Sequence, residues 1–268
     1  MTTHNAEFKF QHVTPENQNG FFRKLRIAVD LDNTSGDYEG GLRHKIAKIL
    51  GVPDAEIAEK FPIVHDYAMG NNGWHAMDTQ EKFFALHSQA VEDGLFSDMV
   101  AYEGVSEVLW RFHGKGHHIR VVTARFLKPG DRYVVGRTTF EWLDKNQIPV
   151  DDIAFTEFKT DVDADVYIDD SPSNIRKLRA AGKTVIIFHQ EYNKDFGGLR
   201  AHNWAEVEAI INELAATPVV TPELVVEAVK ETADRIQVTV DEMAEKATVA
   251  AKAGINKLVD FANRSTKH

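Results

Sequence analysis

The sequence contains no cysteine, no long apolar run and fewer basic than acidic residues. The lack of cysteine excludes a disulfide framework, a thiolate metal site and a cysteine nucleophile, so any metal must be held by oxygen or histidine. No apolar run approaches the ~20 residues of a membrane-spanning helix. Its 31 Lys and Arg against 41 Asp and Glu give a net charge of −10, which argues against broad binding to a nucleic-acid polymer or an anionic membrane. Residues 1–20 lack the apolar core of a secretory signal, and we expect a soluble, cytoplasmic protein.

Short β-branched and aromatic runs recur along the 268 residues, separated by segments of helical period. Each run is bounded by polar residues, which is typical of strands buried on both faces of a parallel sheet. The expected strands are Leu25–Val29, Ile119–Val122, Ile153–Phe155, Val166–Ile168 and Val185–Phe188. The expected buried helix faces include Val105, Val108, Leu109 and Phe112, then Phe140, Trp142 and Leu143, then Ile175, Leu178 and Ala181, then Val207, Ile210, Ile211 and Leu214. This alternation predicts a doubly wound α/β fold with right-handed crossovers.

Three segments lie outside this alternation. Residues 1–22 are polar, and we expect a flexible arm. Residues of about 36–100 follow the first strand, and we expect a small helical cap over the carboxyl ends of the sheet, where such folds bind ligands. Residues 217–268 have apolar residues at helical spacing, which predicts an amphipathic helical extension. It could pack on its own domain or serve self-association or a partner, and we favour association because the α/β unit is complete at Leu214.

Pairs of carboxylates follow two of the expected strands. Asp30 and Asp32 follow the first, and Asp169 and Asp170 follow another. Neighbouring carboxylates repel each other unless a cation or a shared proton compensates. The ends of parallel strands can converge at one sheet edge, so four carboxylates there would suit a hard cation such as Mg²⁺. One such pair alone could be a turn or a helix cap, but two pairs at two strand ends favour a metal site.

Thr123 and Lys159 lie in the chain between these acidic pairs. A hydroxyl and the amides of a following turn can hold a phosphoryl oxygen, as Thr123 could do at its strand end. The ammonium of Lys159 could offset the charge of a carboxylate and a phosphate. Taken singly, Thr123 could be a satisfied strand-end hydroxyl and Lys159 a surface lysine. Their order between the acidic pairs favours the phosphate interpretation.

The ordered set Asp30-Leu31-Asp32-Asn33-Thr34, Thr123, Lys159 and Asp169-Asp170 resembles the four motifs of the haloacid dehalogenase superfamily. Within it, Asp37-Tyr38-Glu39-Gly40-Gly41 and the run from Lys159 to Asp170 resemble the 5′(3′)-deoxyribonucleotidases, and the run through Ile148-Pro149 and Tyr192-Asn193 is similar to bacterial nucleotidase-like members. The resemblance spans about residues 25–215. It implies a Rossmann-like catalytic domain over 23–216, with the cap inserted after the first strand.

The resemblance also implies roles for the motif residues. Asp30 would be the nucleophile that forms an aspartyl-phosphate. Asp32 would protonate the leaving oxygen and then deprotonate water, and its carbonyl would bind Mg²⁺. Thr123 would hold the phosphoryl group, and Lys159 would steady Asp30 and the phosphate. The metal set would be Asp30, Asp32, Asp169 and Asp170, with Asp170 matching the direct ligand of the deoxyribonucleotidases.

Four further residues are candidates for substrate binding. Tyr38 replaces the phenylalanine of the family run and keeps a ring that could stack on a base or sugar. Trp74, in the GNNGW stretch, could be an aromatic platform or a core residue of the cap. Ala124 and Arg125 replace Ser-Pro after the second motif, and Arg125 could bind a second anion or make a local salt bridge. Asn33 replaces a glycine, which the backbone tolerates if it is left-handed there.

These residues predict a Mg²⁺-dependent phosphatase that acts on nucleotides, with a deoxyribonucleoside monophosphate as the expected substrate. A phosphatase for another small phosphate ester is a second hypothesis. Dehalogenation is disfavoured because it has no need of the acid that Asp32 supplies. A third hypothesis is a weakly active nucleotide-binding scaffold whose C-terminal helix binds a partner or a second copy.

Overall fold

The computed structural model describes residues 23–67, 69–125 and 132–216, together with Lys230, Gln237 and Lys246, which are helical. The chain divides into two compact units, Met1–Thr217 and Pro218–His268. The expected arm over 1–22 and nearly all of the expected extension over 217–268 lie outside the described residues. No helix within the described ranges is long and apolar enough to span a bilayer.

The first unit is built on a six-stranded parallel sheet with the order β5-β4-β1-β6-β7-β8. The strands are β1 (Arg26–Val29), β4 (His118–Thr123), β5 (Asp152–Phe155), β6 (Val166–Asp169), β7 (Val185–Phe188) and β8 (Arg200–Ala201). The expected doubly wound α/β fold is therefore confirmed. The two-residue strand β8 was not predicted, because so short a run has no measurable periodicity.

The sheet buries both faces, and its residues alternate between two apolar clusters. Ile27 and Val29 of β1 face one cluster and Ala28 faces the other. The first cluster packs against α5 (Val105–Gly114), α6 (Arg132–Lys145) and α8 (Trp204–Ala216), and the second packs against α7 (Pro172–Ala180). Because side chains alternate along a strand, near-continuous apolar runs are needed to cover both faces.

Phe140 of α6 differs from its expected place in the core. Its side chain is 51% exposed, whereas Trp142 is fully buried. The buried positions of α6 include Val135, Thr138, Thr139 and Trp142, so the inward stripe follows the helical period and Phe140 lies outside it. Phe140 instead contacts the ring of Phe155 with centroids 6.5 Å apart.

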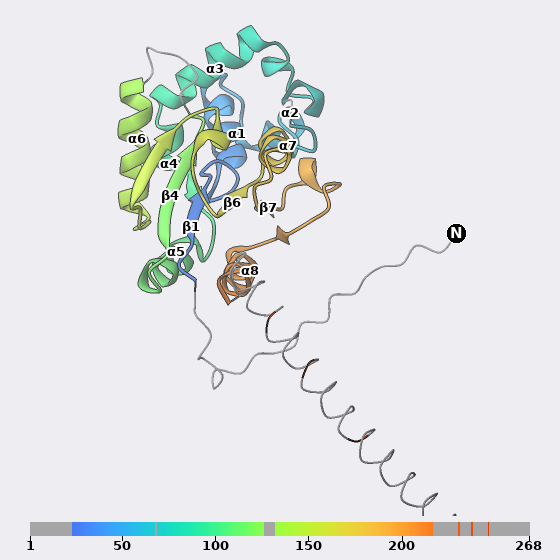
Figure 1. Ribbon diagram of the computed structural model, residues 1–268. Coiled ribbons are helices and arrows are strands. Elements are labelled where there is room, and N and C mark those ends of the chain that lie inside the picture. The colour runs from blue at the N-terminus through green and yellow to red at the C-terminus, as the bar shows by residue number, and fades with distance from the viewer. Residues whose placement is uncertain are drawn as a thin grey trace, which may run out of the picture. The chain divides into compact units, whose positions relative to one another are not determined.

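A short antiparallel ribbon separates the cap from the sheet. Its strands are β2 (Gly36–Asp37) and β3 (Val100–Ala101). Between them lie the helices α1 (Tyr38–Ile49), α2 (Ile57–Lys60), α3 (Gln80–Glu92) and α4 (Leu95–Asp98), with short 3-10 turns. These helices share a third apolar cluster that includes Leu42, Ile46, Trp74 and Leu95. In Figure 1, α1, α2 and α3 lie toward the top of the first unit and α5 and α8 toward its bottom.

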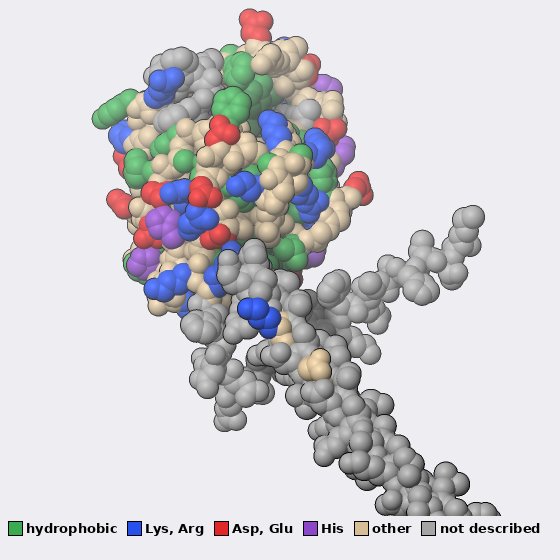
Figure 2. Space-filling view, in the orientation of Figure 1, with side chains coloured by type: hydrophobic (Ala, Val, Ile, Leu, Met, Phe, Trp, Pro, Cys, Tyr) green, Lys and Arg blue, Asp and Glu red, His purple; other side chains and the backbone are tan. Residues whose placement is uncertain are grey.

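The surface of the first unit mixes charges of both signs. On the face in Figure 2, acidic and basic side chains are interspersed among the described residues. Typical exposed pairs are Lys48 with Asp93 at 2.8 Å and Lys82 with Asp78 at 2.7 Å. Such exposed pairs contribute little to stability.

Candidate active site

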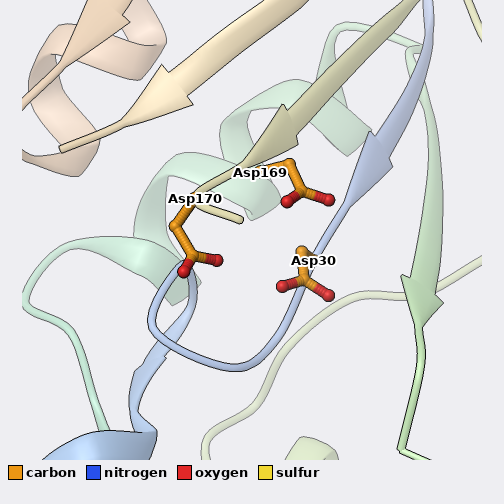
Figure 3. Close-up of side chains that lie close together, drawn as sticks. All are labelled: Asp30, Asp169 and Asp170. Carbon is orange, nitrogen blue, oxygen red and sulfur yellow. The ribbon is translucent and has the colours of Figure 1, made fainter. Parts of the chain in front are cut away.

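Asp30 and Asp169 meet because their strands are neighbours in register. Val29 of β1 pairs with Ile168 of β6, and the Asp30 amide donates to the Ile168 carbonyl at 3.0 Å. The next residue on each strand is therefore an aspartate at the same edge of the sheet. Figure 3 shows Asp30, Asp169 and Asp170 at these adjoining strand ends.

The three carboxylates form a buried cluster that suits a hard cation. One oxygen from each of Asp30, Asp169 and Asp170 lies within 4.8 Å of the others. Burial and the repulsion of Asp169 raise the pKa of Asp170 to about 7, against the lowering effect of hydrogen bonds from Tyr192 and Thr34. Burial likewise raises the pKa of Asp30, with Lys159 opposing and the neighbouring aspartates adding to the rise. An all-oxygen, electron-rich site of this kind fits Mg²⁺ rather than a soft metal.

Lys159 is buried between two of these carboxylates. It precedes β6 in a 3-10 turn (Lys159–Asp161), and its side chain is 4% exposed. Its Nζ lies 2.6 Å from Asp30 Oδ1 and 2.7 Å from Asp169 Oδ2. Burial alone would lower the pKa of Lys159, but the attraction of Asp169 and Asp30 raises it above its usual value. Lys159 therefore carries a positive charge between the two strand ends and is not a surface lysine.

Asp169 and Asp170 are held in different ways. Asp169 accepts hydrogen bonds from the Ser171 amide at 2.9 Å and from Asn174 Nδ2 at 3.2 Å, besides Lys159. Asp170 accepts from Thr34 Oγ1 at 2.9 Å and from the Tyr192 hydroxyl. Each carboxylate is thus oriented before any ligand arrives, which is how donors around a metal site set its geometry.

Asp32 lies apart from this cluster. Its carboxylate is 26% exposed and pairs with Arg125, whose Nη2 donates to Oδ1 at 2.7 Å. The Arg125 side chain is fully buried. The local salt bridge, one of the two alternatives for Arg125, is therefore the contact that the structure shows. The side chain of Asp32 is not among the clustered carboxylates, so any metal contact of Asp32 would be through its backbone.

The backbone after β1 turns sharply at Asn33. Its φ is +56°, in the left-handed region, which meets the condition under which asparagine can replace the glycine of the family motif. Its side chain accepts from the Glu39 amide at 2.9 Å and donates to the Tyr192 hydroxyl at 3.0 Å. The Asn33 side chain therefore links the turn to α1 and to Tyr192, which orients Asp170. A glycine has no side chain and could not make these two contacts.

Thr123 and Ala124 lie at the carboxyl end of β4. Thr123 is fully buried, and its hydroxyl has no hydrogen-bond partner among the described residues. A buried hydroxyl without a partner is uncommon in a folded protein. Ala124 lines the adjoining cavity. Thr123 itself is not among the residues that line the cavity, so its hydroxyl lies just behind this wall.

A cavity of about 520 Å³ joins the acidic cluster to the cap. Asp30, Lys159 and Asp170 line its polar end. The cap end is mainly aromatic, with Tyr38, Phe83, Phe84, His87 and Phe96. The Tyr38 ring stacks on Phe96 with centroids 6.4 Å apart, and Phe83 stacks on His87 at 5.3 Å. The cavity can therefore hold an anionic group at one end and a flat or apolar group at the other.

Trp74 is placed in the core of the cap. Its side chain is fully buried, and its Nε1 donates to the Pro62 carbonyl at 2.8 Å. It packs edge-on against Phe61 with centroids 5.3 Å apart and is not among the residues that line the cavity. Of the two alternatives for Trp74, the structure thus favours the core residue over the substrate platform, because no face of the ring is open.

Several residues of the site were given no role from the sequence, although Thr34 and Tyr192 stand in runs that carry the family resemblance. Thr34, Asn174 and Tyr192 each hold one of the clustered aspartates. Thr34 and Asn174 lie within five residues of an aspartate, so they could have been found by asking which donors follow each strand end. Tyr192 is 22 residues after Asp170, and only the tertiary structure connects them.

Comparisons with known proteins identify the family of this chain. The family described as 5′ nucleotidase, deoxy (Pyrimidine), cytosolic type C protein matches residues 23–218. A Chlorobaculum tepidum protein named "Putative 5′(3′)-deoxyribonucleotidase" is 32% identical over 186 residues, which cover 69% of this chain and 89% of that protein. An Oceanobacillus iheyensis protein named "Putative nucleotidase OB0422" is 29% identical over 141 residues, which cover 46% of this chain and 72% of that protein.

Solved structures with a similar fold include a haloacid dehalogenase-like hydrolase from Streptococcus pneumoniae, with a TM-score of 0.47 and 14% identity over 70% of this chain and 98% of that one. The resemblance to the 5′(3′)-deoxyribonucleotidases inferred from the motifs is confirmed by the family match and by the Chlorobaculum relative. The chain belongs to the cytosolic type C 5′ deoxynucleotidase family and is a phosphatase.

Proposed function

We propose that this phosphatase hydrolyses (deoxy)ribonucleoside 5′-monophosphates with Mg²⁺, through an aspartyl-phosphate on Asp30. The observation that carries the proposal is the buried cluster of Asp30, Asp169 and Asp170 at one end of a cavity whose other end is aromatic. The polar end suits a metal and a phosphate, and the aromatic end suits a base or sugar. The names of the family and of its Chlorobaculum member also support a nucleotide substrate.

Each residue has a role in the proposed reaction. An oxygen of Asp30 attacks phosphorus, the bond from phosphorus to the ester oxygen breaks, and Asp32 gives a proton to the leaving alcohol. Asp32 then takes a proton from the water that attacks the phosphoryl group, which releases phosphate and frees Asp30. Lys159 and the Thr123 hydroxyl would hold phosphoryl oxygens. A bound Mg²⁺ would neutralise charge on the transferring group.

The residues present fit the metal. Asp30, Asp169 and Asp170 would hold it through carboxylate oxygens, and the Asp32 carbonyl would add a backbone ligand. The hydrogen bonds to Asp170 from Thr34 and Tyr192 leave further lone pairs on its carboxylate, because each carboxylate oxygen can accept more than once. The carboxylate of Asp170, the residue directly after β6, would therefore be free to coordinate the metal while Thr34 and Tyr192 hold it.

The proposal is tested by phosphate release from a panel of monophosphates with Mg²⁺. The panel contains ribo- and deoxyribonucleoside 5′- and 3′-monophosphates and, as controls, several sugar phosphates. We expect turnover of 5′-nucleotides to be fastest. Fast turnover of sugar phosphates with none of any nucleotide would reject the substrate class and favour a phosphatase for another small ester.

The covalent step has its own test. Mass spectrometry of protein quenched in acid during turnover should detect a phosphorylated peptide that contains Asp30. The same peptide from the Asp30→Asn variant should remain unmodified. Steady turnover by Asp30→Asn at the normal rate would exclude Asp30 as the nucleophile.

A further inference from the structure

Arg125 is a buried arginine beside the proposed acid–base residue. It follows β4 directly after Thr123 and Ala124, and its side chain is fully buried. Its Nε donates to Asp32 Oδ1 at 3.1 Å and its Nη2 to the same oxygen at 2.7 Å. Its Nη1 donates to Thr139 Oγ1 of α6 at 3.1 Å.

The rest of the guanidinium contacts residues of the cap and its junction. Its carbon lies 4.2 Å from the centroid of the Phe96 ring of α4. Its Nη2 is 3.7 Å from the sulfur of Met99, just before β3. The edges and one face of the group are thus occupied, and it would have to give up these contacts to bind a substrate anion.

The position of Asp32 differs from that of the other three carboxylates. Asp30, Asp169 and Asp170 share a cluster, whereas the Asp32 carboxylate lines the cavity beside Arg125. A free carboxylate near a bound divalent cation would be drawn toward it, because unlike charges attract strongly at a few ångströms in a buried site. Arg125 supplies a competing cation on the other side.

We propose that Arg125 is a positioning residue that holds the Asp32 carboxylate away from the cation site and facing the cavity, and that it is not a ligand for a substrate anion. The proposal rests on the proposed function, in which Asp32 exchanges protons with the leaving alcohol and with water. The same guanidinium also contacts the cap, through the ring of Phe96 in α4.

The first test compares kcat with KM in the Arg125→Met variant. A well-placed acid–base group contributes ~10²–10⁴-fold to rate, and poor placement loses part of that. We expect kcat to fall about 10- to 100-fold, while KM and the inhibition constant of inorganic phosphate change less than about threefold. A rise of about tenfold in both constants with kcat retained would show instead that Arg125 binds the anion, since that is the loss of uniform binding.

The second test asks whether Arg125 acts through Asp32. In the Asp32→Asn background, Arg125→Met should cost nothing further in kcat, because the group that it positions is already gone. Independent, multiplicative losses would overturn the proposal. The matched control is Arg120→Met, which removes an arginine of β4 whose Nη2 pairs with Asp152 Oδ2 at 2.7 Å, and it should leave kcat unchanged.

A third measurement does not depend on turnover. Mg²⁺ affinity is measured by calorimetry with and without Arg125→Met, in both the Asp32 and the Asp32→Asn backgrounds. We expect Arg125→Met to tighten Mg²⁺ binding at least threefold more when Asp32 is present. Equal shifts in the two backgrounds would overturn the proposal. If the wild-type chain hydrolyses no nucleotide, the proposed function fails, yet this measurement still decides the position of Asp32.

Two milder variants guard against misfolding of Arg125→Met. Arg125→Lys keeps the charge but loses the two-nitrogen contact, and we expect its kcat to lie between those of Arg125→Met and the wild type. Thr139→Val removes only the acceptor of Nη1, and kcat should fall about two- to fivefold, a loss of about 0.5–1 kcal/mol. This loss should vanish in the Asp32→Asn background, and its persistence there would contradict the proposal.

Discussion

The two ends of the cavity are built by different means. At the polar end, Asp30 and Asp169 are placed by the register of two parallel strands, and Lys159 joins them. At the cap end, the aromatic wall comes from helices α1, α3 and α4, with Tyr38, Phe83 and Phe96. Backbone hydrogen bonds set the first arrangement and side-chain packing sets the second. Changes at the polar end should therefore alter the rate, and changes in the wall should alter substrate affinity.

The strongest test of this comparison is Asp30→Asn. The variant keeps the shape of the side chain but removes the nucleophile, so we expect kcat to fall more than ~10³-fold while KM stays within about threefold. Phosphate release gives both constants, and calorimetric Mg²⁺ binding checks that the site is still formed. A large rise in KM with little loss of kcat would assign Asp30 to binding and break the comparison.

The second prediction concerns pH and metal removal. The pKa of Asp170 is raised to about 7, so the folded metal-free protein holds a proton there that the unfolded chain has released above about pH 4. This contribution to the free energy of unfolding is present at low pH and is lost as pH rises through about 7. With EDTA, Tm should therefore fall between pH 5 and 8 by several degrees, at about 2–4 °C per kcal/mol.

The control for this prediction is Asp170→Asn, because the asparagine side chain has no carboxyl group to titrate. Its Tm with EDTA should show a smaller decline over the same pH range. Added Mg²⁺ should raise the Tm of the wild type most at pH 8, where the carboxylates repel each other. An identical pH slope in both proteins would mean that Asp170 does not titrate in this range.

The third prediction probes the aromatic wall. Phe83→Leu keeps an apolar side chain but removes the ring, and stacking on a base is worth ~1–3 kcal/mol. We expect KM for nucleotides to rise about tenfold and kcat to change less than about twofold. Sugar phosphates in the panel serve as the control, because they have no base to stack. An equal effect on both substrate classes would show that Phe83 shapes the cavity without contacting a base.

The fourth prediction concerns the hydroxyl that this chain adds to the family motif. Tyr38→Phe keeps the ring stacked on Phe96, so the wall should remain intact. The hydroxyl is worth about 1 kcal/mol if it donates to the sugar, so kcat/KM should fall about three- to tenfold. Comparison of ribo- and deoxyribonucleotides shows which sugar oxygen it meets. No change with either sugar would remove Tyr38 from the polar contacts of the substrate.

The smallest effect on catalysis is expected for Trp74→Phe. The change removes the hydrogen bond to Pro62 and part of the cap core. The free energy of unfolding should therefore fall by ~1–3 kcal/mol, and Tm should fall with it. Both kcat and KM should stay within about twofold, because the ring does not line the cavity. A rise in KM of tenfold or more at unchanged Tm would restore Trp74 as a substrate platform.

The sequence by itself determined the sheet and the residues that end its strands. The apolar runs predicted β1, β4, β5, β6 and β7, because a strand that is buried on both faces must consist almost entirely of apolar residues. Asp30, Asp169 and Asp170 follow such strands, so their meeting at one edge was a consequence of parallel pairing. The glycine of the family motif left open whether the backbone at Asn33 is left-handed, and the structure shows that it is.

Only the tertiary structure decided which side chains assist these aspartates. Tyr192 reaches Asp170 from 22 residues away, and Arg125 pairs with Asp32 from 93 residues away. Trp74 and Tyr38 are both aromatic residues of the insertion, yet one fills the cap core and the other lines the cavity. Local patterns specify strands because backbone pairing repeats along the chain. Side-chain partners depend on packing between elements, which has no period in the sequence.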